Sequence, residues 1–153
     1  MPLCVLRFQK PFRAILGPVE SFRFACVPGC SECCRQQGFV YLTEEHLRRA
    51  AAFLRLSVAA FERRYVYRTR HLLRLRKPRG SQCHFLRERG CAIHPVKPVQ
   101  CAAFPFWPEL VDSRAAWKQA AAYCPGIGSG PPVPAATADR IASEMRSRYP
   151  GVY

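Results

Sequence analysis

The stretch that decides the fold is CVPGCSECC, residues 26–34, which places four cysteines close together in the chain. Three residues separate Cys26 from Cys30, and two separate Cys30 from Cys33. Gaps of two to four residues let one tight turn direct both sulfurs at a metal ion about 2.3 Å away. A proline and a glycine between the first two cysteines favour such a turn. A lone cysteine usually behaves as a small apolar residue, but that interpretation does not account for this density.

Four further cysteines lie too far apart in the chain to form a site from one local turn: Cys83, Cys91, Cys101 and Cys124. They can join the first group only through the tertiary fold, and eight thiolates are enough for two sites of four. Cys33 and Cys34 are neighbours that point in different directions, so we expect them to serve different ions or different corners of a cluster. Cys4 has no cysteine nearby, and we interpret it as a small buried apolar residue.

Disulfides explain these cysteines poorly. The total of nine is odd, so a full disulfide scheme would leave one unpaired. The apolar run at the N-terminus is too short for the core of a signal peptide. Charged residues also interrupt every window of the roughly 20 apolar residues that a membrane-spanning helix needs. We therefore expect a cytoplasmic protein without a membrane segment, whose thiols stay reduced and bind metal.

The chain is strongly basic, with 24 lysines and arginines against 10 acidic residues and a formal net charge of +14. Such a balance suits a polyanionic partner such as nucleic acid. Residues 63–79 concentrate basic side chains, and Tyr65 and Tyr67 lie among them, a composition that can contact phosphates and stack on bases. Basic patches alone are weak motifs, so a solvated face is the favoured interpretation and nucleic-acid binding is the alternative.

Short elements alternate along the chain. Strands are expected over 22–26, 38–42, 71–76, 83–86 and 91–94. Helices are predicted over 44–55, 58–67, 113–123 and 138–149, with one helical turn up to Cys101. Thr43, Ser57 and Thr137 precede three of these helices and can cap them. The proline- and glycine-rich segments 77–81 and 124–134 are predicted to be a turn and a loop.

These elements predict an α+β fold, one small domain over residues 1–153, with short helices, a small antiparallel sheet and cysteine loops held by metal. A chain so rich in proline and glycine often needs such a staple beside its apolar core.

Four segments in this order resemble the YkgJ-like cysteine-cluster family, whose CxxCxxCC-type domain is described as chelating zinc or iron. They are FRFACVPGCSECC (22–34), VYLTEEHLRRAAAFL (40–54), CHFLRERGCAIHPVKPVQCAAFPF (83–106) and CPGIGSG (124–130). The resemblance implies that eight cysteines are the metal ligands: Cys26, Cys30, Cys33, Cys34, Cys83, Cys91, Cys101 and Cys124. This chain departs from the family in its first cysteine gap, which is one residue longer than usual. His94, Lys97 and Ala102 also stand where the family tends to have tyrosine, arginine and arginine.

The leading prediction is a metal-binding protein that chelates zinc or iron, with an iron–sulfur cluster as one form of the iron. The cluster of flagellin lysine N-methylases, to which this one is similar, implies such an iron–sulfur centre. The role would lie in redox chemistry, in metal handling or as an accessory to a modification enzyme, with a protein partner. Two alternatives are an enzyme that uses the centre for redox chemistry or methyl transfer, and a zinc-stabilised nucleic-acid-binding module. The enzyme would need an open coordination position.

Histidine is a common metal ligand, so either His84 or His94 could replace a thiolate. His84 and His94 follow or lie near cysteines, and we expect them to pack beside the site rather than bind the metal. His46 and His71 are expected on the surface. The aromatic run at 104–107 is predicted to shield the metal from water.

Overall fold

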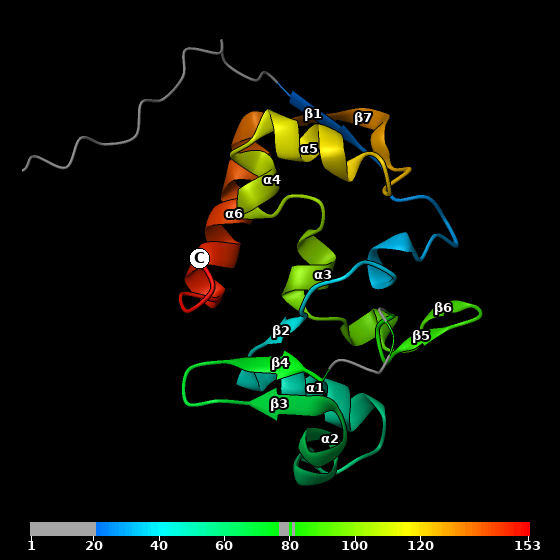
Figure 1. Ribbon diagram of the computed structural model, residues 1–153, viewed down its shortest axis with the longest axis vertical. Coiled ribbons are helices and arrows are strands. Elements are labelled where there is room, and N and C mark those ends of the chain that lie inside the picture. Colours follow the sequence, from blue (N-terminus) through cyan, green and yellow to red (C-terminus); the bar gives the residue numbers. More distant parts are fainter. Residues whose placement is uncertain (1–20, 77–79, 81) are drawn as a thin grey trace, which may run out of the picture.

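The computed structural model describes residues 21–76, 80 and 82–153 and has an α+β fold, as predicted (Figure 1). The predicted small sheet is three separate antiparallel units within this part of the chain. The predicted turn at 77–81 lies largely outside the described residues. A lipid bilayer would need a longer and more apolar helix than any that the described part of the chain forms.

The upper part of Figure 1 is a two-stranded ribbon covered by helices. Its elements are β1 (Ser21–Phe24), β7 (Ile127–Pro134), α4 (Pro108–Val111), α5 (Arg114–Ala120) and α6 (Ala135–Arg148). Phe22 of β1 is buried here and meets the Trp117 ring at a centroid distance of 4.6 Å. The ring of Phe106 lies 6.2 Å from that of Phe22. Burial of three such aromatic side chains supplies most of the apolar area of this core.

The strand β7 contradicts the predicted loop at 124–134. β7 contains three prolines, which cannot donate a ladder hydrogen bond. Because β7 pairs with only one of the described strands, the missing donors leave no second strand unpaired. The pairing jumps from Arg23 with Pro132 to Phe24 with Ile127, so residues 128–131 bulge out. The turn-forming residues therefore form the bulge, and the rest of β7 pairs with β1.

The lower part of Figure 1 is a three-stranded sheet packed on two helices. Its elements are β2 (Tyr41–Leu42), α1 (Glu44–Phe53), α2 (Val58–Tyr65), β3 (Val66–Arg68) and β4 (Leu73–Leu75). The predicted caps are confirmed: the Thr43 hydroxyl accepts the His46 N–H at 3.3 Å, and the Ser57 hydroxyl accepts the Ala60 N–H at 3.1 Å. Capping supplies partners for amide groups that the first turn leaves unpaired.

Between these two parts lie the elements that carry most of the cysteines. They are a helical turn η1 (Glu32–Cys34), the hairpin of β5 (Leu86–Arg87) and β6 (Gly90–Cys91), a turn η2 (His94–Val96) and α3 (Val99–Ala103). The helical turn at Cys101 is confirmed as α3. The predicted strands 83–86 and 91–94 shrink to two residues each, because the Leu86 N–H returns to the Cys83 carbonyl and His94 begins η2.

Two further boundaries were wrong. The last helix begins at Ala135, after Pro134, so Thr137 lies inside its first turn and does not cap it. A proline before a helix has the fixed backbone angle that the helix entry needs, which moves the start towards it. The second predicted helix ends at Tyr65, because the next three residues form β3 and pair with β4.

His46 is buried, with 1% of its surface exposed, which contradicts its predicted place on the surface. Its ring nitrogens lie 3.2 Å from the Thr43 amide and 3.3 Å from the Val99 amide, and the Tyr149 hydroxyl is 3.4 Å from Nδ1. The ring thus joins α1, α3 and the end of α6. A protonated His46 ring would place its own N–H groups against the two backbone N–H groups. Burial also lowers the pKa of His46 below 6.5.

This environment predicts a pH dependence of stability. The unfolded chain takes up a proton on His46 as the pH falls through about 6.5, whereas the folded chain resists it until a lower pH. His46 in the folded protein therefore stabilises fully above pH 6.5 and less below it. In denaturant titrations from pH 8 to 5.5, the stability advantage of the wild type over His46→Gln should shrink with falling pH.

His71→Gln is the matched control, because His71 is exposed. Its stability difference from the wild type should change little over the same range. A wild-type advantage over His46→Gln that stays constant from pH 8 to 5.5 would contradict the assignment.

Gly126 gives a second prediction, because β1 and β7 approach closely there. A Cβ atom on Gly126 would lie 2.4 Å from the Ala25 carbonyl oxygen, which accepts no such contact without moving the strands. Gly126→Ala should lower the free energy of unfolding by about 1–3 kcal/mol, as overpacking does. Gly80→Ala is the control, because none of the described residues lies within 4 Å of its added methyl. Chemical denaturation of both variants at equal metal content measures the difference; equal stabilities would contradict it.

Candidate metal centre

The first cysteine group is shaped by two successive turns. The Cys30 N–H donates to the Val27 carbonyl at 3.0 Å, and Gly29 between them has a φ of 76° that suits glycine. The Cys34 N–H then donates to the Ser31 carbonyl at 2.9 Å within η1. These turns confirm the local reading of the sequence and direct the chain from β1 towards the middle of the molecule (Figure 1).

The second cysteine group reaches this loop through the backbone. The Cys83 N–H donates to the Cys34 carbonyl at 2.9 Å, and Leu86 pairs with Cys91 in the short hairpin. Phe85 and Ile93 anchor the hairpin, since both are buried in the core of α1 and α2. Two apolar side chains thus hold Cys83 and Cys91 beside the loop that carries Cys34.

Three thiols in a row, Cys33, Cys34 and Cys91, lie close enough to shift one another's pKa. A hydrogen bond from Cys34 lowers the pKa of Cys33 to about 6 and that of Cys91 to about 6, although Cys33 and Cys91 come from separate parts of the chain. The same hydrogen bonds raise the pKa of Cys34, so Cys34 keeps its proton when the other two thiols ionise. Thiolates are the forms of cysteine that bind metal.

Cys83 and Cys101 border this row. Burial raises the pKa of Cys83, and burial followed by the charges of Cys83, Cys91 and Cys33 raises the pKa of Cys101 to about 12. Each of these charges would oppose ionisation of a further thiol, and a bound cation reverses that opposition.

The short helix α3 is held in place for Cys101 by its neighbour Gln100, which is buried. The Gln100 side chain accepts the Tyr41 N–H at 2.6 Å and donates to the Phe39 carbonyl at 3.1 Å. Its own carbonyl accepts the Trp107 indole N–H at 2.7 Å. Sequence reasoning missed this residue, since a lone glutamine between valine and cysteine carries no periodic signal.

Lys97 is a second residue that the sequence analysis did not place in the site. Its charge contributes to the lowered pKa of Cys33 and of Cys91, and Nζ lies 3.3 Å from His94 Nε2. The available signal was its position between Cys91 and Cys101 in the chain. A cation facing several thiolates reduces their mutual repulsion.

The remaining cysteines lie near the end of the β1–β7 ribbon. The Ala25 N–H donates to the Gly126 carbonyl at 3.1 Å, which brings the stretch with Cys26 beside the stretch with Cys124. Burial raises the pKa of Cys124, and the charges of Cys30 and Cys33 add to it. Cys26 and Cys33 are exposed to solvent.

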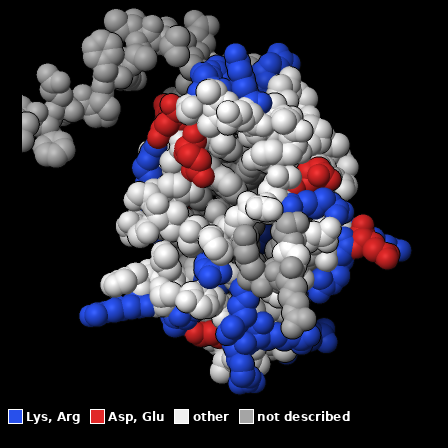
Figure 2. Space-filling model, viewed as in Figure 1, with Lys and Arg blue, Asp and Glu red and all other residues white. Residues whose placement is uncertain are grey.

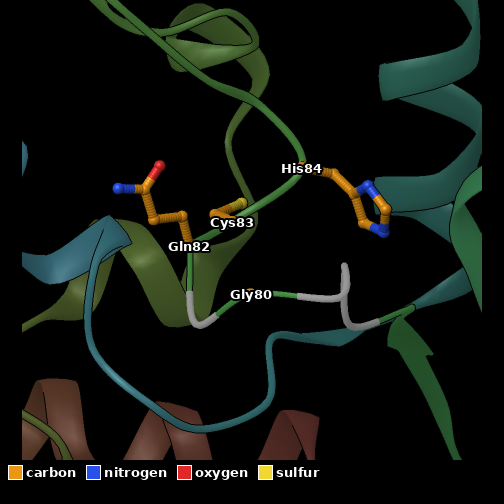
Figure 3. A pocket seen from close by; sticks show the side chains of 4 residues that line it. All are labelled: Gly80, Gln82, Cys83 and His84. Atoms are coloured by element: carbon orange, nitrogen blue, oxygen red, sulfur yellow. The ribbon is translucent and has the colours of Figure 1, made fainter.

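His84 turns its ring away from the row of thiols. Figure 3 shows the side chains of Gln82 and His84 extending to opposite sides of their segment, with Cys83 between them. A cavity of about 320 Å³ lies here. The His84 ring packs 6.0 Å from the Tyr65 ring, and its Nε2 is buried without a hydrogen-bond partner among the described residues. Burial lowers the pKa of His84, although a hydrogen bond to the Arg76 backbone partly opposes this.

The donor set fits zinc or iron by its chemistry, because soft thiolates suit both metals. The eight described cysteines carry free thiols, and Cys33, Cys34 and Cys91 lie close together. Over 21–76, 80 and 82–153, however, no three cysteine, histidine or acidic side chains surround one point as ligands of a single ion. The structure thus gathers the donors without arranging them around a common centre.

Comparison with known proteins bears on this site. The family model described as "CxxCxxCC: Putative zinc- or iron-chelating domain" matches residues 25–125. This chain belongs to the CxxCxxCC family. The matched range includes all eight described cysteines, the hairpin and α3. No solved structure matches the chain.

The pKa values of this CxxCxxCC domain predict the order in which its thiols react. In reduced, metal-free protein, alkylation of Cys33 and Cys91 by iodoacetamide should rise as the pH passes about 6 and then level off. Alkylation of Cys101 should keep rising to the highest pH tested, because its pKa is about 12. Tandem mass spectrometry of short labelling pulses from pH 5 to 9 measures each rate.

Cys34→Ala supplies the control, since it removes the hydrogen bond that lowers the pKa of Cys33. The midpoint of Cys33 labelling should then move to higher pH. Equal labelling profiles for Cys33 and Cys101 in the wild type would contradict the described environment.

Proposed function

We propose that this protein chelates zinc or iron through its eight clustered cysteines, arranged as two sites of four thiolates. Cys33 and Cys34 would divide between the sites. The first site would use Cys26, Cys30, Cys33 and Cys124. The second would use Cys34, Cys83, Cys91 and Cys101.

The observation that carries this proposal is the proximity of the Cys34 and Cys91 thiols, each of which shifts the pKa of the other. These residues are far apart in sequence, and the backbone hydrogen bond from Cys83 to Cys34 holds the same two segments together. Burial of several ionisable thiols beside one another costs free energy unless a cation or a shared proton offsets their charge. A metal ion supplies that offset and contributes to folding.

The first site has weaker but independent support. The charges of Cys30 and Cys33 act on Cys124, and the Ala25–Gly126 hydrogen bond joins the two stretches that carry the outer members. This site is more open than the second, because Cys26 and Cys33 are exposed. Closed thiolate sites are usually structural, whereas an accessible one allows exchange or redox chemistry.

We therefore assign the second site to structure and the first to metal handling or redox chemistry. An iron–sulfur cluster in the first site would serve the redox role, and zinc or iron exchange would serve the other. Reduced thiols of this kind persist in the cytoplasm, where we place the protein.

Anaerobic purification followed by elemental analysis and a visible spectrum tests this function. The wild type should carry two zinc ions per chain, or iron with sulfide and a brown colour if a cluster forms. Cys26→Ser with Cys124→Ser should lose the first-site metal while keeping the fold. Cys83→Ser with Cys101→Ser should lose the second-site metal together with much of the stability, because a structural zinc contributes about 10–16 kcal/mol of apparent binding free energy.

Cys4→Ser is the control, since the proposed sites do not include Cys4, which lies outside the described residues; this variant should keep the wild-type metal content. Anaerobically purified wild-type protein that contains neither zinc nor iron would overturn the proposal. Loss of all metal in both double variants would replace two sites with one shared cluster.

A further inference from the structure

Arginines gather at the lower end of the molecule. Figure 2 shows basic side chains concentrated there, over the end formed by α2, β3 and β4 in Figure 1. The described arginines of this segment are Arg63, Arg64, Arg68, Arg70, Arg74 and Arg76. Lys97 and Arg87, by contrast, are the cations whose charge acts on the central thiols. The arginines of the lower end therefore have a different use.

The three-stranded sheet presents aromatic side chains beside these arginines. Tyr41 of β2, Arg74 of β4 and Tyr67 of β3 face one another across the sheet in register. The Arg74 guanidinium lies 4.2 Å from the Phe39 ring centroid and 4.3 Å from that of Tyr67. Cation–π contacts at these distances fix the orientation of the rings. Tyr67 nevertheless remains 44% exposed.

An open groove of about 540 Å³ runs beside Tyr67. Three arginines line it, Arg63, Arg68 and Arg76, together with a single acidic residue, Glu62. Tyr67 also lines the groove, so its ring lies next to the guanidinium groups. This combination places a flat aromatic surface and several cations along one channel.

The charge of the groove is only partly neutralised. Arg68 pairs with Glu62 and with Glu44, the latter at 2.6 Å, so these three groups compensate one another. Arg63 and Arg76 are exposed and take part in none of the ion pairs that the described residues form. Two uncompensated guanidinium groups thus flank an exposed tyrosine.

We propose that this groove binds single-stranded nucleic acid, with Arg63 and Arg76 on the phosphates and a base stacked on Tyr67. Guanidinium groups pair with phosphate oxygens in a planar, bidentate geometry. Bases stack on aromatic side chains without sequence preference when they are free of a duplex. Arg74 supports the stack by holding the tyrosine ring from the sheet. This function stands apart from metal binding, although the metal would stabilise the fold that presents the groove.

Fluorescence anisotropy of metal-loaded protein with a labelled 20-nucleotide oligo(dU) or oligo(rU) strand tests the proposal. The wild type should bind both strands and bind a duplex of equal length more weakly. Arg63→Gln with Arg76→Gln should weaken single-strand binding by roughly tenfold or more at low salt and reduce the salt slope by about 1.4, or 0.7 per lost phosphate contact. Tyr67→Ala should weaken binding about tenfold, and Tyr67→Phe should restore it.

Lys118→Gln with Arg140→Gln is the matched control. Both residues are exposed on α5 and α6, and the substitutions remove the same charge from another part of the molecule. This control should retain most of the affinity. An equal loss in both double variants, or no effect of Tyr67→Ala, would reduce the binding to general attraction between a basic protein and a polyanion and overturn the proposal.

Metal content measured on the same samples separates this inference from the proposed function. The groove variants should keep the wild-type metal content. Wild-type protein with its full metal content and no affinity for single strands would overturn the groove and leave the metal sites intact. Protein without metal that still binds single strands through Tyr67 would support the groove and overturn the metal sites.

Discussion

The hydrogen bonds that Cys34 makes to Cys33 and Cys91 are the interaction on which the middle of the molecule depends. Three neighbouring thiols cannot all ionise without strong repulsion, so Cys34 keeps its proton when Cys33 and Cys91 lose theirs. A bound metal ion would also offset the thiolate charges, and it would contribute far more free energy to folding. Structural zinc contributes about 10–16 kcal/mol in apparent binding, which matches or exceeds the 5–15 kcal/mol stability of a typical domain. Metal bound at the proposed sites would therefore stabilise this fold.

Buried polar side chains position the segments that meet at this row. α3 has only five residues and no side-chain cap, so it is too short to be stable alone. Gln100 ties it to the backbone around β2, and His46 ties its first residue to α1. Loss of one such bond leaves a buried partner unsatisfied, which costs more than the bond contributes. The placement of Cys101 thus rests on directional hydrogen bonds more than on apolar contacts.

Features that depend on residues close together in the chain were predicted correctly, and features that depend on distant residues were not. Thr43 and Ser57 cap helices through atoms three residues away, so their neighbours in the sequence were sufficient to predict them. β7 escaped prediction because its partner β1 lies about a hundred residues earlier and its prolines resemble a loop. His46 was misplaced for a similar reason: its helical position suggests exposure, while its partners Val99 and Tyr149 come from distant elements. The cysteine spacing indicated a local loop, but it gave no means of pairing Cys34 with Cys91.

The electrostatics of the chain separate into two regions with different demands. The thiols in the middle need cations, and the nearest contributions come from Lys97 and Arg87 on their own segments. The arginines of α2, β3 and β4 make other contacts: Arg74 lies over the rings of Phe39 and Tyr67, and Arg68 is paired with acids. The charges that act on the thiols therefore account for only a small part of the net charge of +14. Among the described residues Arg63 and Arg76 take part in no ion pair, and the proposed phosphate contacts rest on these two exposed arginines beside Tyr67.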